Sequence, residues 1–348
     1  MAFRPAPMSD SSEWRASSGA RRNVLLLIID DLRSDLGCFG RRWSRSPSID
    51  ALSSRSSTFL QAHSQFANCA PSRASLLTGL RPDTHAVYDL TTHVRDRHRR
   101  LATLPQVFRQ SGYLAISYGK IFHQFLDDDR SWSGQSEFTD NHTYRGLRGR
   151  AWSRAGGWSK GWRYNQYMTA PNLAKQAETV RRRREKDFAV SINGLVPPYE
   201  IGPDRTEGGE SYTDERLASL AVRALRRLRR QPRPWLLAVG FIRPHLPFNA
   251  PARFWAQSGA AAEHVPTGSE GPPSEGLSRL TLSHLGGGDG ELYDFAHASR
   301  HLRAASSEGR DLARAYAAAV SFVDEQVETG GDAAPTACRA HATACPQL

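Results

Sequence analysis

The sequence predicts an α/β fold in which helices pack on both faces of a largely parallel β-sheet. Three observations support this prediction: unbroken apolar segments recur along the chain, helical patterns separate them, and polar residues follow them directly. Strands that helices cover on both faces are continuously apolar. Alternation of such strands with helices is typical of parallel sheets built from β-α-β units. The predicted architecture is therefore an αβα sandwich.

The composition fits a globular domain of this kind. The chain has 348 residues, 39% of them hydrophobic, which suffices for one large or two ordinary domains. The formal net charge is +11, and all but four of the 46 basic residues are arginine. No DNA- or RNA-binding motif accompanies this charge, so we expect no nucleic-acid partner. No apolar run is long enough to span a bilayer, so we expect no transmembrane segment.

The first strand is predicted over residues 24–29 and is expected to be central in the sheet. It ends at Asp30 and Asp31. Open α/β sheets bind their ligands at the carboxyl ends of the strands. Two adjacent carboxylates there repel each other unless a cation or an arginine offsets their charge. A bound metal ion explains the pair economically, and a solvated turn is the alternative.

Short helices and strands follow in order. A capping serine and an early proline predict a helix from Ser46 to Leu52. Residues 58–62 are expected to form a strand that leads to Cys69. A second helix is predicted over 103–112, with a threonine cap, an early proline and a glycine stop, and a buried strand over 113–118.

The segment Cys69-Ala70-Pro71-Ser72-Arg73 places a reactive side chain at the start of a helix that ends at Gly79. Proline suits the first turn of a helix, and the exposed N–H groups there attract an anion. Arg73 adds a rigid fork of donors suited to phosphate or sulfate. We therefore interpret Cys69 as a nucleophile beside an anion site, the alternative being a buried structural cysteine.

Lys120 and His123 follow the strand over 113–118. Lysine is rare in this chain, and its ammonium is a compact donor whose pKa responds to burial. In isolation both residues would be ordinary loop side chains. Because the segments at Asp30, Cys69 and Lys120 are each expected at the carboxyl edge of the sheet, we predict that they converge on one crevice.

The second half of the chain is less regular at first. Residues 127–211, rich in Gly, Arg and Trp, are expected to form long loops that either shape a substrate pocket or pack on themselves. A clear amphipathic helix follows over 213–230, with an arginine-rich end that we interpret as a solvated helix terminus. A strand over 235–241 leads to His245, which prolines hold in extended backbone as a general acid or base. A last helix is predicted over 311–327.

In this order the motifs resemble the sulfatase family of the alkaline phosphatase superfamily, most closely its iduronate-2-sulfatase group. The resemblance implies a sulfatase or alkaline-phosphatase-like fold and a sulfuric ester hydrolase that removes sulfate from a sulfated sugar. The matching segments are Asp30 to Arg33, Leu36 to Gly40, Ser46 to Asp50, Cys69 to Gly79, Arg81 to Thr84, Gly119 to His123 and Ala238 to Phe248.

The resemblance also implies how the nucleophile and the metal site are built. In the family a formylglycine-generating enzyme oxidises the motif cysteine, here Cys69, to formylglycine. Asp30 and Asp31 would ligate Ca²⁺ together with the modified Cys69. One hydroxyl of the hydrated aldehyde would attack sulfur, and the other would expel the sulfate.

The remaining site residues take their implied roles from the same motifs. Arg73 and Lys120 would neutralise the nucleophile and the sulfate. His123 would hydrogen-bond the formylglycine hydrate. His245 would contact the sulfate and help to protonate the leaving oxygen.

The resemblance also sets the expected domain organisation. Residues 23–327 would form the catalytic domain, after a disordered segment over 1–22 and before an unstructured tail over 328–348. The family continues with a strand ending in Asp-His or Asp-Asn that completes the calcium site, and that pattern is missing here. We therefore expect a C-terminally truncated sulfatase. The family implies a lysosomal or secreted protein, but no signal peptide is recognisable.

Two alternative functions stay open. The chain could be an inactive truncated remnant that binds sulfated polymers through its arginines. It could also be a phosphodiesterase or phosphonate monoester hydrolase of the same superfamily that uses the same modified cysteine.

Overall fold

The structure is a computed structural model of the chain. It describes residues 21–41, 43–123, 126–134, 167–184, 195–204, 212–262, 292, 295–296 and 306–332. The helices and strands, in order, are β1 (Val24–Ile29), η1 (Gly37–Phe39), α1 (Pro47–Ser53), α2 (Cys69–Thr78), α3 (Pro82–His85), α4 (Val94–Arg97), α5 (Leu104–Gln110), β2 (Leu114–Gly119), α7 (Ala170–Arg184), β3 (Tyr199–Gly202), α8 (Thr213–Leu228), β4 (Trp235–Phe241), β5 (Phe248–Pro251), α9 (Ala252–Gln257), η3 (Gly259–Ala262) and α11 (Ser307–Asp332).

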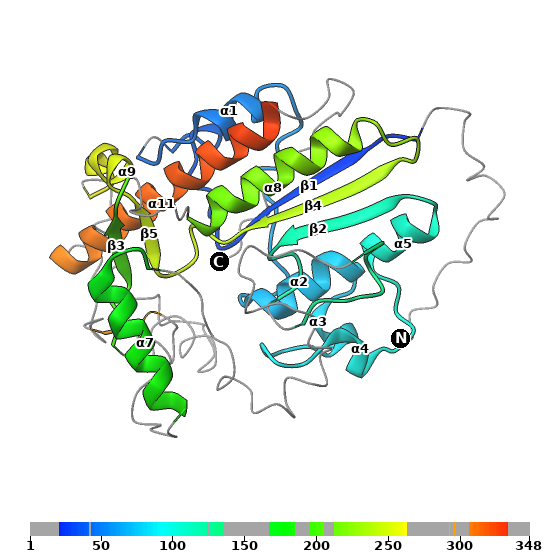
Figure 1. The fold of residues 1–348 in the computed structure, drawn as a ribbon, viewed down its shortest axis with the longest axis horizontal. Helices are drawn as coiled ribbons and strands as arrows, with labels where there is room; N and C mark the ends of the chain where they lie inside the picture. The colour runs from blue at the N-terminus through cyan, green and yellow to red at the C-terminus, as the bar shows by residue number, and fades with distance from the viewer. Residues whose placement is uncertain are drawn as a thin grey trace, which may run out of the picture.

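The main sheet is parallel and has the order β1-β4-β2 in the described part of the chain. Val24 pairs with Leu236 and Leu114 with Trp235, so the three strands begin at one edge and end at the other (Figure 1). Every residue of β4 is buried, whereas β1 is mostly half-buried. The expectation that β1 is central is therefore not met within the described residues, where the uninterrupted apolar β4 lies in the middle.

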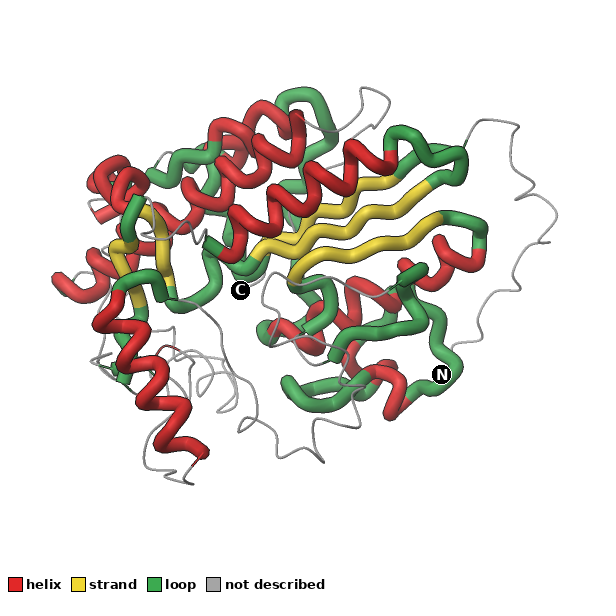
Figure 2. The backbone as a smooth tube through the Cα atoms, viewed as in Figure 1, coloured by secondary structure: helices red, strands yellow, loops and turns green. Residues whose placement is uncertain are grey.

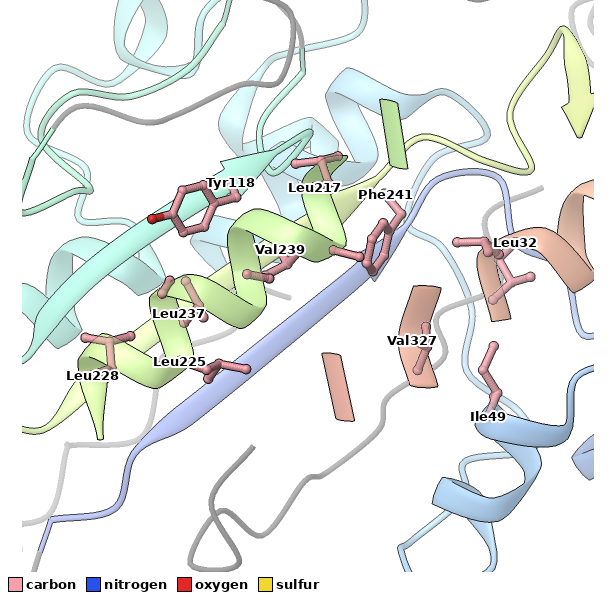
Figure 3. Packing of buried hydrophobic residues seen from close by; sticks show 14 of the residues in the cluster. Leu32, Ile49, Tyr118, Leu217, Leu225, Leu228, Leu237, Val239, Phe241 and Val327 are labelled. Atoms are coloured by element: carbon pink, nitrogen blue, oxygen red, sulfur yellow. The ribbon is translucent and has the colours of Figure 1, made fainter. Parts of the chain in front are cut away.

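One face of the sheet carries α8, α11 and α1 (Figure 2). The fully buried leucines of α8, Leu217 and Leu225, pack with Leu237 and Val239 of β4 (Figure 3). Burial of each such side chain contributes about 2 kcal/mol. Val320 and Val323 of α11 extend the same cluster. The amphipathic helix predicted over 213–230 therefore exists and fixes the sheet from one side.

The opposite face carries α2 and α5. Leu77 of α2 and Phe108 of α5 pack against Ile28, Ala115 and Leu236 of the strands. Helices thus cover both faces, and the predicted αβα sandwich is confirmed. The second helix predicted around residues 103–112 is α5, and the Thr103 side chain accepts a hydrogen bond from the backbone N–H of Gln106 at its start.

A smaller two-stranded parallel sheet, β3 with β5, packs against α9 and α11. The expectation that residues 127–211 form only loops is therefore wrong, because this range contains α7 and β3. The buried Glu200 of β3 accepts hydrogen bonds from the Met168 and Thr169 N–H groups just before α7. The residues in this contact are about thirty positions apart, so no local sequence pattern predicts it. The tryptophans at 152, 158 and 162 lie outside the described residues.

Two other expectations need correction. Residues 58–62 do not form the expected strand but contain a turn, in which Phe59 and Leu60 are exposed. No described strand lies beside these residues to form backbone hydrogen bonds with them. The last helix, predicted to end at Val327, continues to Asp332. In the described segments no helix is both long and apolar enough to cross a membrane.

Candidate active site

Cys69 is the first residue of α2, and Arg73 lies one turn later on the same face of that helix. Asn68 precedes the helix in extended backbone, and Gly79 ends it with a left-handed φ of 71°, a conformation that glycine adopts without a steric penalty. Cys69 is half-buried, and the four residues after it are buried. The predicted helix start is thus confirmed, with a half-buried Cys69 at its first position.

Arg73 connects this helix to the ends of two strands. Its guanidinium donates hydrogen bonds to the Asp30 carboxylate and to the carbonyl oxygens of Lys120 and Ile121, 3.0 Å away in the latter case. The side chain is completely buried. Its Nε–H has no acceptor among the described residues. A buried donor without a partner costs about 1–3 kcal/mol, which an anionic oxygen at this point would recover.

Lys120 follows β2, and two glycines let it approach its neighbours. A Cβ at Gly119, whose φ is 75°, would lie 2.2 Å from the Gly240 carbonyl oxygen. A Cβ at Gly240 would lie 2.1 Å from the Lys120 carbonyl oxygen. The Lys120 ammonium is buried and donates to the second carboxylate oxygen of Asp30. The strand ends therefore close together around Asp30, as the predicted crevice requires.

Asp30 is fully buried between these two cations. Burial alone would raise the pKa of its carboxyl, but Arg73 and Lys120 outweigh burial and hold that pKa well below the ordinary value. The same interaction raises the pKa of Arg73 against the effect of burial. Asp30 is consequently ionised and Arg73 protonated at neutral pH. One carboxylate faces two cations, which leaves the local charge positive before Asp31 is counted.

Asp31 has left-handed backbone, with a φ of 56°. This conformation is uncommon for residues other than glycine, although aspartate tolerates it better than most. Tyr316 of α11 holds the turn: its hydroxyl donates to the Asp31 carbonyl oxygen at 2.9 Å and accepts from the Arg33 N–H at 2.8 Å. Its ring packs edge-on against Phe248. The contact spans 285 residues, so sequence spacing could not have revealed it.

His245 lies between β4 and β5 and faces both aspartates. Its Nε2 is 3.9 Å from Asp30 Oδ2 and 3.7 Å from Asp31 Oδ2. Its Nδ1 lies 2.6 Å from the Leu246 carbonyl oxygen, which can only accept, so Nδ1 carries the proton of that hydrogen bond. Nε2 is therefore the nitrogen that faces the site.

The backbone around His245 differs from the extended conformation expected. The chain bends here, the His245 N–H donates to the Ile242 carbonyl at 3.0 Å, and the bonds before Pro244 and Pro247 are cis. The buried Asp214 of α8 holds this bend, because it accepts hydrogen bonds from the backbone N–H groups of Ile242 and Arg243. Asp214 lies in the first turn of α8, and no local sequence pattern indicates that it holds the bend after β4.

His123 is buried three residues after Lys120 and lies near enough to Lys120 and Asp30 for their charges to act on its ring. Burial, and then the nearby Lys120 charge, hold its pKa well below the ordinary value for histidine. The imidazole is therefore neutral at pH 7, and one ring nitrogen remains a hydrogen-bond acceptor. The structure thus brings the predicted residues Asp30, Arg73, Lys120 and His245 into mutual contact or close approach, with His123 and Cys69 beside them.

The aspartates offer the donors that calcium prefers, which are carboxylate oxygens. Asp30 uses one lone pair of each oxygen for Arg73 and Lys120, and Asp31 is partly exposed. Calcium takes six to eight oxygen ligands. Over the described segments, however, no three His, Cys, Asp or Glu side chains cluster as a metal site. The two carboxylates fit calcium in kind and form one part of its shell.

The architecture and the site define a class: an α/β protein of alkaline-phosphatase-like fold with buried cations gathered at the carboxyl edge of its sheet. The chain belongs to the sulfatase family, whose family model, described as Sulfatase, matches residues 22–330. The crystal structure of phosphonate monoester hydrolase of Agrobacterium radiobacter has a similar fold, with a TM-score of 0.54 at 22% identity. The aligned region covers 90% of this chain and 59% of the hydrolase chain.

Two curated relatives are closer in sequence. The chain is 35% identical over 244 residues to iduronate 2-sulfatase of Homo sapiens and 34% identical over 232 residues to that of Mus musculus. These alignments cover 70% and 67% of this chain. They cover 39% of the human and 36% of the mouse protein, so the chain spans less than half the length of either relative.

Proposed function

We propose that the residues around Cys69 form the active site of a sulfuric ester hydrolase whose substrate is a sulfated saccharide. The observation that carries the proposal is the pair of buried cations, Arg73 and Lys120, at the helix that begins with Cys69. The Arg73 Nε–H, which has no acceptor within the part of the chain that the structure describes, adds a donor for an anionic oxygen. The names of the two curated relatives indicate a sugar sulfated at the 2-position of iduronate.

Cys69 is the candidate for the group that attacks sulfur. After oxidation by a formylglycine-generating enzyme, position 69 would supply a hydrated aldehyde, which is a hydroxyl nucleophile with a built-in means of releasing sulfate. The N-terminus of α2 favours negative charge at this position. His123, neutral and buried, is a hydrogen-bond acceptor for a hydroxyl at position 69.

The cations and His245 would act on the ester itself. Arg73 and Lys120 stabilise negative charge on the sulfuryl oxygens, and their burial strengthens that interaction because water is excluded. His245 presents Nε2 to the site. Because Nδ1 keeps its own proton, Nε2 accepts a proton when the ring is neutral and would donate that proton to a leaving sugar oxygen from the imidazolium form. Asp30 keeps both cations in place and remains ionised.

Asp30 and Asp31 are the residues that would hold calcium. When bound, Ca²⁺ supplies further positive charge to the sulfate group. Tyr316 would fix the Asp31 backbone for that purpose. Without the metal ion the two carboxylates balance the charges of Arg73 and Lys120, so bound Ca²⁺ would make the local charge positive and favour an anion.

Turnover of small esters tests the proposal. Protein produced together with a formylglycine-generating enzyme should hydrolyse an aryl sulfate and a 2-sulfated uronate disaccharide, and Cys69→Ala should remove both activities. Cys38→Ala is the matched control, because Cys38 is also half-buried and unpaired by disulfide. Activity that survives Cys69→Ala would refute the proposal.

Phosphate diesters and phosphonate monoesters belong in the same assay. Preferential turnover of these substrates would replace the sulfatase assignment with that of a phosphoester or phosphonate hydrolase using the same residue. Absence of turnover of every ester, together with binding of a sulfated polymer, would favour the inactive remnant instead.

A further inference from the structure

The edge of the sheet opposite the candidate active site is strongly basic. At this edge β1, β2 and β4 begin and α5 and α8 end, on the right of Figure 1. We define the basic edge by six exposed arginines that three segments bring here: Arg21, Arg22, Arg109, Arg229, Arg230 and Arg233.

Hydrogen bonds place the three segments side by side. Arg21 donates to the Ser111 carbonyl, and Arg233 donates to the Gly112 carbonyl at 3.2 Å. A Cβ on Gly112 would lie 3.1 Å from the Arg21 guanidinium. Because both arginines bind adjacent carbonyls of one turn, their charges are held close together. Arg109 lies in the last turn of α5, just before that turn.

Among the described residues, no carboxylate forms an ion pair with these arginines. The ion pairs in the described part of the chain use other arginines, and the acceptors of Arg21 and Arg233 are neutral carbonyl oxygens. The stretch from 216 to 234 contains seven arginines and no aspartate or glutamate. Like charges gathered in this way repel unless an anion lies between them.

We propose that the basic edge is a second binding surface for a sulfated polysaccharide, distinct from the catalytic crevice. This inference rests on the proposed function for the identity of its ligand. Guanidinium groups match sulfate and carboxylate oxygens bidentately. β4 has seven residues, so the two edges lie roughly 20 Å apart at about 3.3 Å per residue. A polymer bound at the basic edge keeps many sulfate esters close to the crevice.

A nucleic acid is the less suitable polyanion. Proteins that bind single strands stack the bases on exposed aromatic rings. Among the described residues, the large aromatic side chains that are well exposed are Phe59 and Tyr88, and neither belongs to the segments of the basic edge. The ligand is therefore recognised by its charge and its sulfate geometry alone.

The test measures binding of a heparin-derived oligosaccharide by calorimetry at several salt concentrations. The variant Arg109→Glu/Arg230→Glu changes two exposed arginines whose side chains make no hydrogen bond among the described residues. The matched control, Arg45→Glu/Arg55→Glu, alters net charge equally on two other exposed arginines whose side chains make no hydrogen bond or ion pair among the described residues. We expect at least a roughly tenfold loss of affinity and a shallower salt dependence for the first variant only.

Equal losses in both variants would overturn the proposal, because the effect would then belong to net charge. Tighter binding of an oligonucleotide than of the oligosaccharide would overturn the choice of ligand. Turnover of a small aryl sulfate should be unchanged in Arg109→Glu/Arg230→Glu. Since binding is measured without turnover, also on Cys69→Ala protein, failure of the proposed function and failure of this inference give different results.

Discussion

Replacing Gly240 by alanine tests how closely β4 and the residues after β2 must approach to place Lys120. A Cβ at position 240 would lie 2.1 Å from the Lys120 carbonyl oxygen and 2.8 Å from its backbone nitrogen. Ordinary contacts begin near 3.4 Å, so the Lys120 backbone must retreat by about 1 Å. Overpacking of this kind costs about 1–3 kcal/mol of stability. Misplacement of a catalytic group by about 1 Å lowers the rate roughly 100-fold.

Urea unfolding and kcat/KM for an aryl sulfate measure the two effects separately. Gly259→Ala is the matched control, because nothing lies within 4 Å of a Cβ at that position. We expect the control to match the parent protein in both measurements. A Gly240→Ala protein with the stability and activity of the control would refute the close approach. A protein that lost stability but kept full kcat/KM would refute the claim that this approach positions Lys120.

Three further substitutions probe the site. Asp30→Asn leaves two buried cations without a carboxylate partner. It should lower the free energy of unfolding, measured in a denaturant titration, by about 3–5 kcal/mol. A loss below about 1 kcal/mol would contradict the burial of the charges. Because folding depresses the pKa of His123, the unfolded chain binds one more proton than the folded protein below pH about 6.5. The free energy of unfolding should therefore fall between pH 7 and pH 5 by up to about 1.4 kcal/mol per pH unit. His123→Asn should flatten this pH dependence, and an unchanged pH dependence would contradict the neutral imidazole. Tyr316→Phe should speed amide exchange at Arg33 roughly tenfold. Tyr212→Phe, which loses a hydrogen bond to Pro203 instead, should leave that exchange unaltered, and equal rates in both variants would contradict the role of the hydroxyl.

Local chemistry made much of the fold predictable. The apolar segments at 24–29 and 235–241 became β1 and β4, since a strand buried between helices cannot carry polar side chains. Proline and glycine marked the ends of α2 and α5 for steric reasons that act within a few residues. The convergence of Asp30, Arg73 and Lys120 followed from the rule that the carboxyl ends of parallel strands share one edge.

The errors come from contacts between distant segments. Residues 58–62 have the composition of a strand, but a strand also needs a hydrogen-bonding partner, and composition does not supply one. The buried Glu200 that holds the start of α7 lies about thirty residues further along the chain. Tyr316 and Asp214 hold the two bends that aim Asp31 and His245, and each is placed by tertiary packing of a helix.

The chemical state of Cys69 is the most direct test of the account. Trypsin cleavage after Arg55 and Arg73 gives a peptide of residues 56–73 that contains Cys69 as its sole cysteine. Mass spectrometry of protein produced with a formylglycine-generating enzyme should detect an aldehyde in this peptide, while Cys38 in its own peptide remains a thiol. An unmodified Cys69 in protein that hydrolyses a sulfate ester would contradict the proposed nucleophile.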